Sequence, residues 1–291
     1  MLSPMSKTRF HGLALCLLIG SLLSPLATFA SGAEAPASTV QSLDGDGWRI
    51  AADPHNEGRD AKWFAAPREE AKPTKVPWII QDAFPGYHGV AWYWREFEAP
   101  ANLGRDGVPT YAGGRYLLRF GAVDYLAEVW LNGTRVGEHE GGETPFVLDV
   151  TEAIRAGANN KQLLAVRVLN PTHERIDGIV LNETPKQARV IPYRAGAAYN
   201  HGGITGSVEL LVVPVVRVEG LFARADLETD TIKIQANVRN AAQTAVRGRV
   251  ELTVAPAAGG ETLRVATLER ELEPGDTLVE AEVTIAQPRL W

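Results

Sequence analysis

The chain has 291 residues, of which 22% are charged, a formal net charge of -6 and a single cysteine. This length suits one large or two small domains, and an apolar content of 45% suffices for packed cores. The basic residues are scattered along the chain, which argues against a nucleic-acid partner because phosphates select a basic patch. No apolar run reaches the roughly 18 residues of a membrane-spanning helix, so no membrane partner is expected for the mature protein.

Residues 1–30 have the pattern of a secretory signal peptide. Lys7 and Arg9 supply the basic start, residues 13–23 supply the apolar core, and a small-residue cleavage site follows. A short membrane anchor is disfavoured because this core is too short to cross a bilayer. Lipidation of Cys16 is disfavoured because the residue lies in the middle of the core. We therefore expect export to a periplasm or to the cell exterior, with loss of the only thiol.

Short runs with a period of two dominate the following part of the chain. Side chains alternate over residues 115–120, 146–150 and 164–168, which is typical of half-buried antiparallel strands. Asn132-Gly133 separates two further runs, and both residues tolerate positive φ, so a hairpin with a type I′ turn is predicted. The only helix that the sequence favours is residues 151–155, with Thr151 as its cap. An all-β sandwich is therefore predicted for this part.

The composition changes near Pro214. Six of the seven tryptophans lie between Trp48 and Trp130, and the seventh, Trp291, ends the chain. Apolar and polar residues alternate in three runs of the later part, at residues 232–238, 250–254 and 279–285. This pattern predicts a second β-sandwich of immunoglobulin-like character, without a disulfide, that starts near Val215.

Motifs of several common chemistries are missing from the sequence. There is no G-x-S-x-G elbow for a serine nucleophile and no G-x-x-x-x-G-K-[ST] loop for phosphates. The six histidines never share the short spacings of metal ligands. Residues 44–47 begin like a calcium loop, but Trp48 and Arg49 follow where oxygen ligands belong, so a turn is favoured. We expect no cofactor and no metal.

Clustered glutamates offer one further chemistry. Glu96 with Glu98, and Glu138 with Glu140 or Glu143, could supply an acid and a nucleophile about 5 Å apart for a retaining glycosidase. Spacing alone gives no reason for any pair to converge in a cleft, so solvated surface charges are favoured.

The segment Trp92-Tyr93-Trp94 could stack sugar rings, since an aromatic face suits the apolar face of a pyranose. On a strand, Trp92 and Trp94 point to one side and Tyr93 to the other. At least one side is then expected to face a core, and core packing is the favoured interpretation.

Four signatures in this order resemble the amino-terminal domain of family 2 glycoside hydrolases, the β-galactosidases, β-glucuronidases and β-mannosidases. They are WYWREFEAP at 92–100, LRFGAVDYLAEVWLNG at 118–133, VGEHEGGETPF at 136–146, and HGGI followed by VEL within 201–210. The resemblance implies a jelly-roll sugar-binding domain over residues 31–214, followed by an immunoglobulin-like domain over residues 215–291.

In that family the next element is a (β/α)8 barrel that carries both catalytic glutamates. This sequence stops at Trp291, so the resemblance implies no catalytic residue in the chain. Residues 288–291 resemble the stretch that precedes the last strand of the second domain. We therefore expect the second sandwich to be truncated at its C-terminus.

The resemblance also points to one loop. In family members the segment before the Gly-Gly-Ile signature reaches toward the active site and can offer an acidic side chain to the sugar. Residues 194–201 hold no carboxylate, so an acidic contact of the galactosidase or glucuronidase type is not expected. Asn200 and His201 remain as candidate substrate-binding residues, able to donate and accept hydrogen bonds. The alternative is a loop that only packs against a barrel.

Two functions fit these expectations. The first is the non-catalytic amino-terminal portion of an exported family 2 β-glycosidase, which hydrolyses terminal β-linked glycosides with retention and has carbohydrate as its partner. The alternative is a free-standing carbohydrate-binding or interaction module. The expected open edge of the second sandwich favours the first function, because a self-sufficient module should close its sheets.

Overall fold

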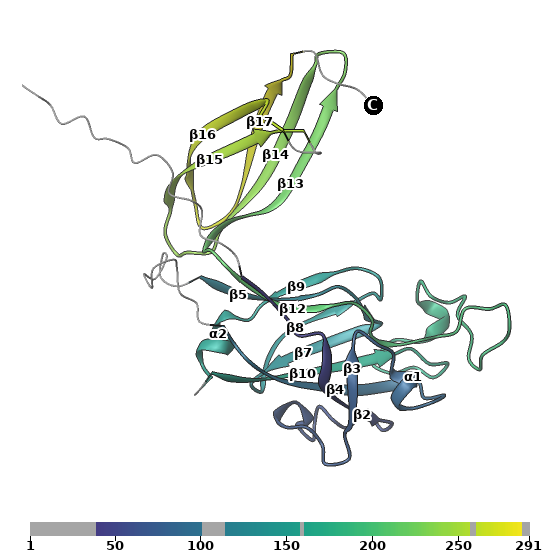
Figure 1. Cartoon of the computed structure of the whole chain (residues 1–291). Helices are drawn as coiled ribbons and strands as arrows, with labels where there is room; N and C mark the ends of the chain where they lie inside the picture. The colour runs from purple at the N-terminus through teal and green to yellow at the C-terminus, as the bar shows by residue number, and fades with distance from the viewer. Residues whose placement is uncertain (1–38, 101–113, 158–159, 257–259, 287–291) are drawn as a thin grey trace, which may run out of the picture. The chain divides into compact units, whose positions relative to one another are not determined.

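The computed structural model describes residues 39–100, 114–157, 160–256 and 260–286 (Figure 1). The expected signal peptide, Cys16 and the chain end at residues 287–291 lie outside these ranges. Every pairing between the named strands is antiparallel, and the described helices are short, so the predicted all-β class is confirmed. Within the described ranges no helix is long and apolar enough to span a membrane.

The first sandwich is built from twelve strands in three sheets. The strands are β1 Thr39–Ser42, β2 Gly45–Asp53, β3 Lys72–Val76, β4 Gly89–Glu98, β5 Arg115–Phe120, β6 Val123–Asp124, β7 Leu126–Leu131, β8 Thr134–Glu140, β9 Phe146–Asp149, β10 Lys161–Asn170, β11 Gly203–Ile204 and β12 Val208–Val213. Their order is β1-β12-β5-β9 in one sheet, β3-β2-β4-β10-β7-β8 in the second and β11-β6 in the third. Many neighbouring strands are distant in sequence, so the chain crosses between the sheets, as in a jelly roll.

The principal core lies between the four-stranded and the six-stranded sheet. Phe120 and Leu210 come from the first sheet, and Tyr93 and Val166 come from the second. All four are buried, because alternate residues of each strand point inward. The period of two in the sequence therefore identified one face of each strand correctly.

A second core covers the opposite face of the six-stranded sheet. Trp92 and Trp94 of β4 pack there with Trp130 of β7 and with Trp63 of the short 3-10 helix η1, Trp63–Ala65. Trp92 and Trp94 are 0% and 1% exposed. Core packing is thus confirmed for this segment, and it holds on both sides of the strand because Tyr93 faces the principal core. The rings of Trp92, Tyr93 and Trp94 are therefore not open to a sugar.

Local structure agrees with the hairpin prediction and corrects the prediction of the helix cap. Asn132 and Gly133 have φ values of 52° and 78°, as a type I′ turn requires. Helix α2 spans Thr151–Arg155, but Val150 precedes it at the cap position, so the cap assignment was wrong. The hydroxyl of Thr151 is instead bound to Asp149, 2.6 Å away. A second short helix, α1 Ile80–Ala83, was not predicted.

The segment 44–47 is a strand irregularity and not the predicted turn. Strand β2 begins at Gly45, and its register against β3 shifts between Gly45 and Trp48. The carboxylate of Asp44 accepts a hydrogen bond from the backbone N–H of Val208 at 2.8 Å. Asp44 therefore links β2 to β12.

The second sandwich starts at Val216, close to the expected boundary. It contains β13 Val216–Asp226, β14 Thr231–Asn240, β15 Val246–Val254, β16 Arg264–Leu272 and β17 Gly275–Thr284. The sheets β13-β14-β17 and β15-β16 enclose an aliphatic core in which Ala236 and Val279 are fully buried. Strands β14, β15 and β17 correspond to the three runs of alternation in the sequence. Strands β13 and β16 lie outside those runs.

Candidate functional site: the connection between β10 and β11

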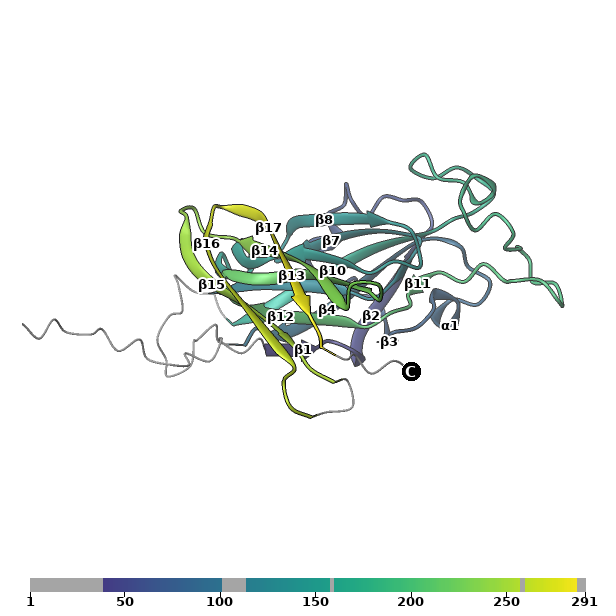
Figure 2. The same cartoon turned by 90° about the horizontal axis from the view of Figure 1, so that it is seen from above.

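The longest described connection of the first sandwich runs from Pro171 to Gly202 and joins β10 to β11. It projects from the end of the sandwich at which α1 lies (Figures 1 and 2). It contains only one 3-10 turn, η3 Leu181–Glu183, and isolated bridges. Connections longer than about 15 residues are uncommon in compact domains and are usually functional or disordered. Three sets of contacts hold this one in place.

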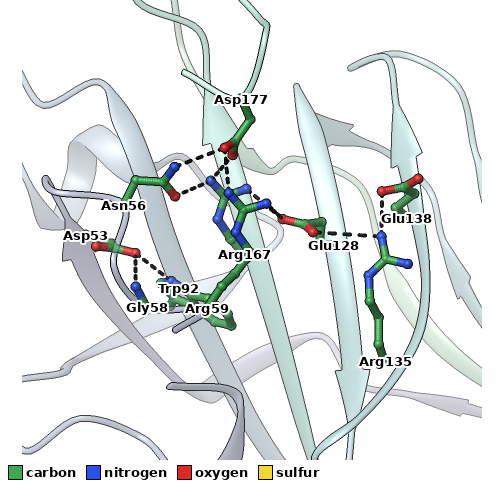
Figure 3. Close-up of polar contacts among 10 residues, drawn as sticks. All are labelled: Asp53, Asn56, Gly58, Arg59, Trp92, Glu128, Arg135, Glu138, Arg167 and Asp177. Atoms are coloured by element: carbon green, nitrogen blue, oxygen red, sulfur yellow. Dashed lines mark hydrogen bonds and ion pairs between the residues drawn. The ribbon is translucent and has the colours of Figure 1, made fainter. Parts of the chain in front are cut away.

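The first set is centred on Arg167 of β10, which is fully buried. Its guanidinium donates to Glu128 of β7 at 2.7 Å, to Asp177 of the connection at 2.5 Å and to Asn56 at 2.5 Å (Figure 3). A buried arginine needs such partners, because an unpaired charge in the interior is strongly destabilising. The start of the connection is therefore attached to the centre of the six-stranded sheet.

Asp177 is bound by two arginines in this set. Arg59, from the segment after β2, donates to Oδ1 of its carboxylate at 2.5 Å, and Arg167 donates to Oδ2. Burial alone would raise the pKa of Asp177, but the Arg167 charge and the hydrogen bonds from Arg59 and Asn56 outweigh it and lower the pKa below its usual value. Asp177 is consequently ionised at neutral pH.

The second set is centred on Asp124, the last residue of β6. One oxygen of this buried carboxylate, Oδ2, accepts from Lys186 at 2.5 Å and from Arg189 at 2.6 Å. Arg189 also donates to the backbone carbonyl of His201 at 2.9 Å. Gly142 covers the group so closely that an added Cβ would lie 2.7 Å from the Asp124 carboxyl. The middle of the connection is therefore joined to β6 through the Asp124 carboxylate and to its own end through Arg189.

The third set contains Asn200, one of the two predicted substrate-binding residues. It is fully buried, and its amide donates to the Pro171 carbonyl at 2.7 Å. Its side-chain oxygen accepts from Asn170 at 3.3 Å. These contacts close the connection upon itself, since Pro171 is its first residue. The structure thus places the Asn200 side chain in the interior and not on the surface.

Asn170 extends this set to an aromatic residue. Its oxygen accepts from Gln81 at 3.0 Å and also lies 2.8 Å from His88 Nδ1. That arrangement assigns the proton of His88 to Nδ1, so Nε2 accepts from the hydroxyl of Tyr199 at 3.0 Å. Tyr199 is therefore bound to the interior by its hydroxyl end.

His201, the other predicted residue, is exposed. Its ring lies 4.8 Å from that of Tyr199, and Tyr199 lies 6.1 Å from Tyr193. Burial lowers the pKa of His201, and the charge of Arg189 lowers it further, whereas the charge of Asp124 opposes both. The imidazole is consequently neutral at pH 7, able to donate through one nitrogen and accept through the other.

The glutamates considered for acid and nucleophile roles are surface residues. Glu96, Glu98, Glu138, Glu140 and Glu143 are all exposed. Glu140 accepts from Tyr125 at 2.9 Å, and Glu138 pairs with the neighbouring Arg135 at 2.5 Å. The interpretation as solvated charges therefore accounts for them. Among the described residues, no group of three His, Cys, Asp or Glu side chains is placed to hold a metal ion.

Sequence reasoning missed the roles of Asp124, Tyr193 and Tyr199. Asp124 lies within the signature at residues 118–133, but nothing in its spacing indicated a contact with a loop far ahead in the sequence. The two tyrosines had a signal, because Tyr193 directly precedes the acid-free segment 194–201 and Tyr199 lies within it.

Comparison with known proteins identifies the family of the first sandwich. Residues 40–214 match the family described as glycosyl hydrolases family 2, sugar binding domain. A β-glucuronidase of Paenibacillus borealis is 36% identical over 200 residues, which are 66% of this chain and 31% of that protein. The β-glucuronidase of Canis lupus familiaris is 28% identical over 215 residues, 68% of this chain and 32% of that protein. The chain thus spans about a third of the length of these curated relatives.

Solved structures show the same fold. The crystal structure of a β-glucuronidase of Bacteroides uniformis has a TM-score of 0.66 and 22% identity, and the match covers 88% of this chain and 29% of that one. A β-glucuronidase of Ruminococcus gnavus in complex with D-glucaro 1,5-lactone has a TM-score of 0.60 and 22% identity, over 87% of this chain and 40% of that one.

Proposed function

Because the chain belongs to family 2 of the glycosyl hydrolases through its sugar-binding domain, we propose that it is the non-catalytic amino-terminal portion of an exported β-glucuronidase. The reaction of the whole enzyme is retaining hydrolysis of terminal β-linked glucuronides. The observation that carries this proposal is the match of residues 40–214 to the domain, together with homology to the amino-terminal third of β-glucuronidases.

The role of this portion in the enzyme is to shape the sugar-facing surface. A sugar-binding domain implies carbohydrate as the partner class. The anchored connection from Pro171 to Gly202 is the described element that can present exposed polar and aromatic groups at one end of the sandwich. His201 is the substrate-contacting candidate there, and Asn200 supports it from the interior.

Export is part of the proposal and rests on the sequence of residues 1–30. Cleavage after residue 30 would leave a chain without cysteine, so the fold would depend on packing alone in an oxidising compartment. Mass spectrometry of the protein recovered from a secreting host tests this: a mature start at residue 31 is expected, and an intact Met1 would contradict export.

The activity is tested by comparing two polypeptides. The 291-residue chain alone is expected to show no turnover of aryl β-glucuronides, β-galactosides or β-mannosides, because a retaining mechanism needs two converging carboxylates. A polypeptide extended through any open reading frame downstream is expected to hydrolyse the glucuronide in preference to the other two. Turnover by the 291-residue chain that a single Glu→Gln change abolishes would overturn the non-catalytic assignment.

The reading frame downstream of Trp291 distinguishes the proposed enzyme from the alternative, a free-standing carbohydrate-binding module. A stop codon directly after Trp291, with a stable secreted product that binds glycans, would favour the module. An open frame that encodes a barrel would favour the enzyme.

A further inference from the structure

We propose that Tyr193, Tyr199 and His201 form an aromatic surface that stacks against the apolar face of a pyranose ring. The proposal rests on the proposed function for its class of ligand and goes beyond it by naming the residues that make the contact. It also replaces the Trp92-Tyr93-Trp94 segment, whose rings are buried, as the aromatic site of the first sandwich.

The three rings are consecutive neighbours and are open to solvent to different degrees. Tyr193 is 65% exposed, the highest value among the described large apolar and aromatic side chains of the first sandwich. Tyr199 is half-buried between Tyr193 and His201, and His201 is exposed. The edge-to-face angles of 75° and 78° create a stepped surface with ring faces at two orientations. Such a surface offers both stacking area and polar ring edges to a sugar.

Tyr199 is pre-organised for this contact. Its hydroxyl donates to His88 Nε2, and the His88 ring packs edge-on against it at 5.4 Å. Because His88 is itself bound to the buried Asn170, the orientation of the Tyr199 ring is determined from inside the sandwich. A ring held in this way loses little conformational entropy on binding, which is the usual advantage of a pre-formed site.

The backbone at Tyr199, Asn200 and His201 is held by contacts with other segments. Asn200 binds Pro171 from within the interior, and Arg189 joins the His201 carbonyl to the buried Asp124. A parallel bridge between Val190 and Tyr199 connects the two arms of the segment. These contacts hold the backbone that carries Tyr199 and His201.

The polar chemistry around the rings suits a sugar that carries hydroxyls and a carboxylate. The neutral imidazole of His201 can both donate to and accept from hydroxyl groups. Residues 185–202 contain no carboxylate that would repel an acidic sugar. Arg194 is an exposed cation of this segment, whereas Lys186 and Arg189 are paired with Asp124. The exposed Trp78 is less suited to stacking on a sugar than these rings. The Lys75 ammonium lies 4.1 Å from its ring centroid and covers one face of the ring.

The experiment is ligand-observed saturation-transfer NMR with the 291-residue chain and methyl β-D-glucuronide. Tyr193→Ala is expected to weaken binding by about 3- to 10-fold, as expected for the loss of one aromatic stacking contact. Tyr199→Phe keeps the ring and removes only the bond to His88, so a smaller loss is expected. Phe222→Ala is the matched control, because Phe222 is 61% exposed but lies on β13 of the second sandwich.

Each outcome decides the proposal. Loss in Tyr193→Ala with parental binding in Phe222→Ala supports it, provided that both variants keep the parental unfolding midpoint. This midpoint is measured by tryptophan fluorescence for Tyr193→Ala and by circular dichroism for Phe222→Ala. Absence of saturation transfer to the parental chain, parental binding by Tyr193→Ala, or equal loss in Phe222→Ala overturns it. None of these results bears on the proposed enzyme, which is judged by turnover in the extended polypeptide.

Discussion

The two sandwiches share strand chemistry but differ in what they bury. The first buries five tryptophans and Tyr93 on the six-stranded sheet and the segment that covers it, and it holds charged residues inside, such as Arg167 and Asp124. The second has a core of aliphatic residues, and its cross-strand ion pairs lie on the surface, such as Arg239 with Asp276.

The difference in buried charge corresponds to a difference in the connections between strands. In the first, the buried charges contact the long connection between β10 and β11, which has little regular structure of its own. In the second, β16 and β17 are joined by only two residues, which need no internal anchor. Buried charge is costly, and it is found here where it positions a loop that carries candidate binding groups.

The strongest contrast is expected between two matched arginine substitutions. Arg167→Met should destabilise the first sandwich by about 3–5 kcal/mol, because it leaves Glu128 and Asp177 without their buried partner. Arg239→Met should cost less than about 1 kcal/mol, because its pair with Asp276 is 41% and 47% exposed. Urea unfolding measures both, with tryptophan fluorescence for the first variant and circular dichroism for the second. Equal effects would contradict the distinction between the sandwiches.

A smaller and pH-dependent effect is expected at Asp177. Its lowered pKa means that the folded state favours the ionised form, so its contribution is present above the unfolded pKa of about 4 and is lost as pH falls. Asp177→Asn should cost about 1–3 kcal/mol at pH 7 and should flatten the loss of stability below about pH 5. Urea unfolding from pH 7 to pH 3 tests this. If the free energy of unfolding falls as steeply toward pH 3 in the variant as in the parental protein, other carboxylates determine the acid dependence of stability.

Two glycines provide a backbone comparison. Gly133→Ala should destabilise the β7–β8 hairpin by about 1–2 kcal/mol, because Gly133 has a φ of 78°. Gly248→Ala in β15 should be neutral or stabilising by up to about 1 kcal/mol, because its Cβ would meet only Leu272 Cδ1 at an ordinary 3.4 Å. Calorimetry of both variants gives the sign, and a stabilised Gly133→Ala would rule out the predicted turn type.

The smallest effect is expected in the titration of His201. Asp124→Asn removes a negative charge that raises the pKa of His201, so this pKa should fall further below its usual value. Glu143→Gln is the control, because Glu143 contacts the same Lys186 from an exposed position. NMR titration of the ring protons measures both variants. An unchanged His201 pKa in Asp124→Asn would mean that Asp124 does not act at the end of the connection.

Local patterns predicted much of the fold and less of the site. The period of two identified strands such as β5 and β10, and Asn132-Gly133 identified the hairpin, because both signals depend on near neighbours in sequence. The cap of α2 was mistaken, because the Thr151 hydroxyl binds Asp149 and not the helix. Of the two candidate substrate-binding residues, His201 is exposed, whereas Asn200, next to it, is buried. Adjacent loop residues have no periodicity from which such a difference could be derived.

The sequence by itself determined the class of fold and the family, since alternation and ordered signatures are properties of the chain. Tertiary structure alone decided that both faces of β4 are covered and that Asp124 and Arg167 hold a connection distant in sequence. It also decided that Tyr193 and His201 are exposed beside the half-buried Tyr199, whereas Trp92, Tyr93 and Trp94 are buried. The physical reason is that periodicity specifies which way a side chain points, whereas burial and contact depend on which other segment packs against it.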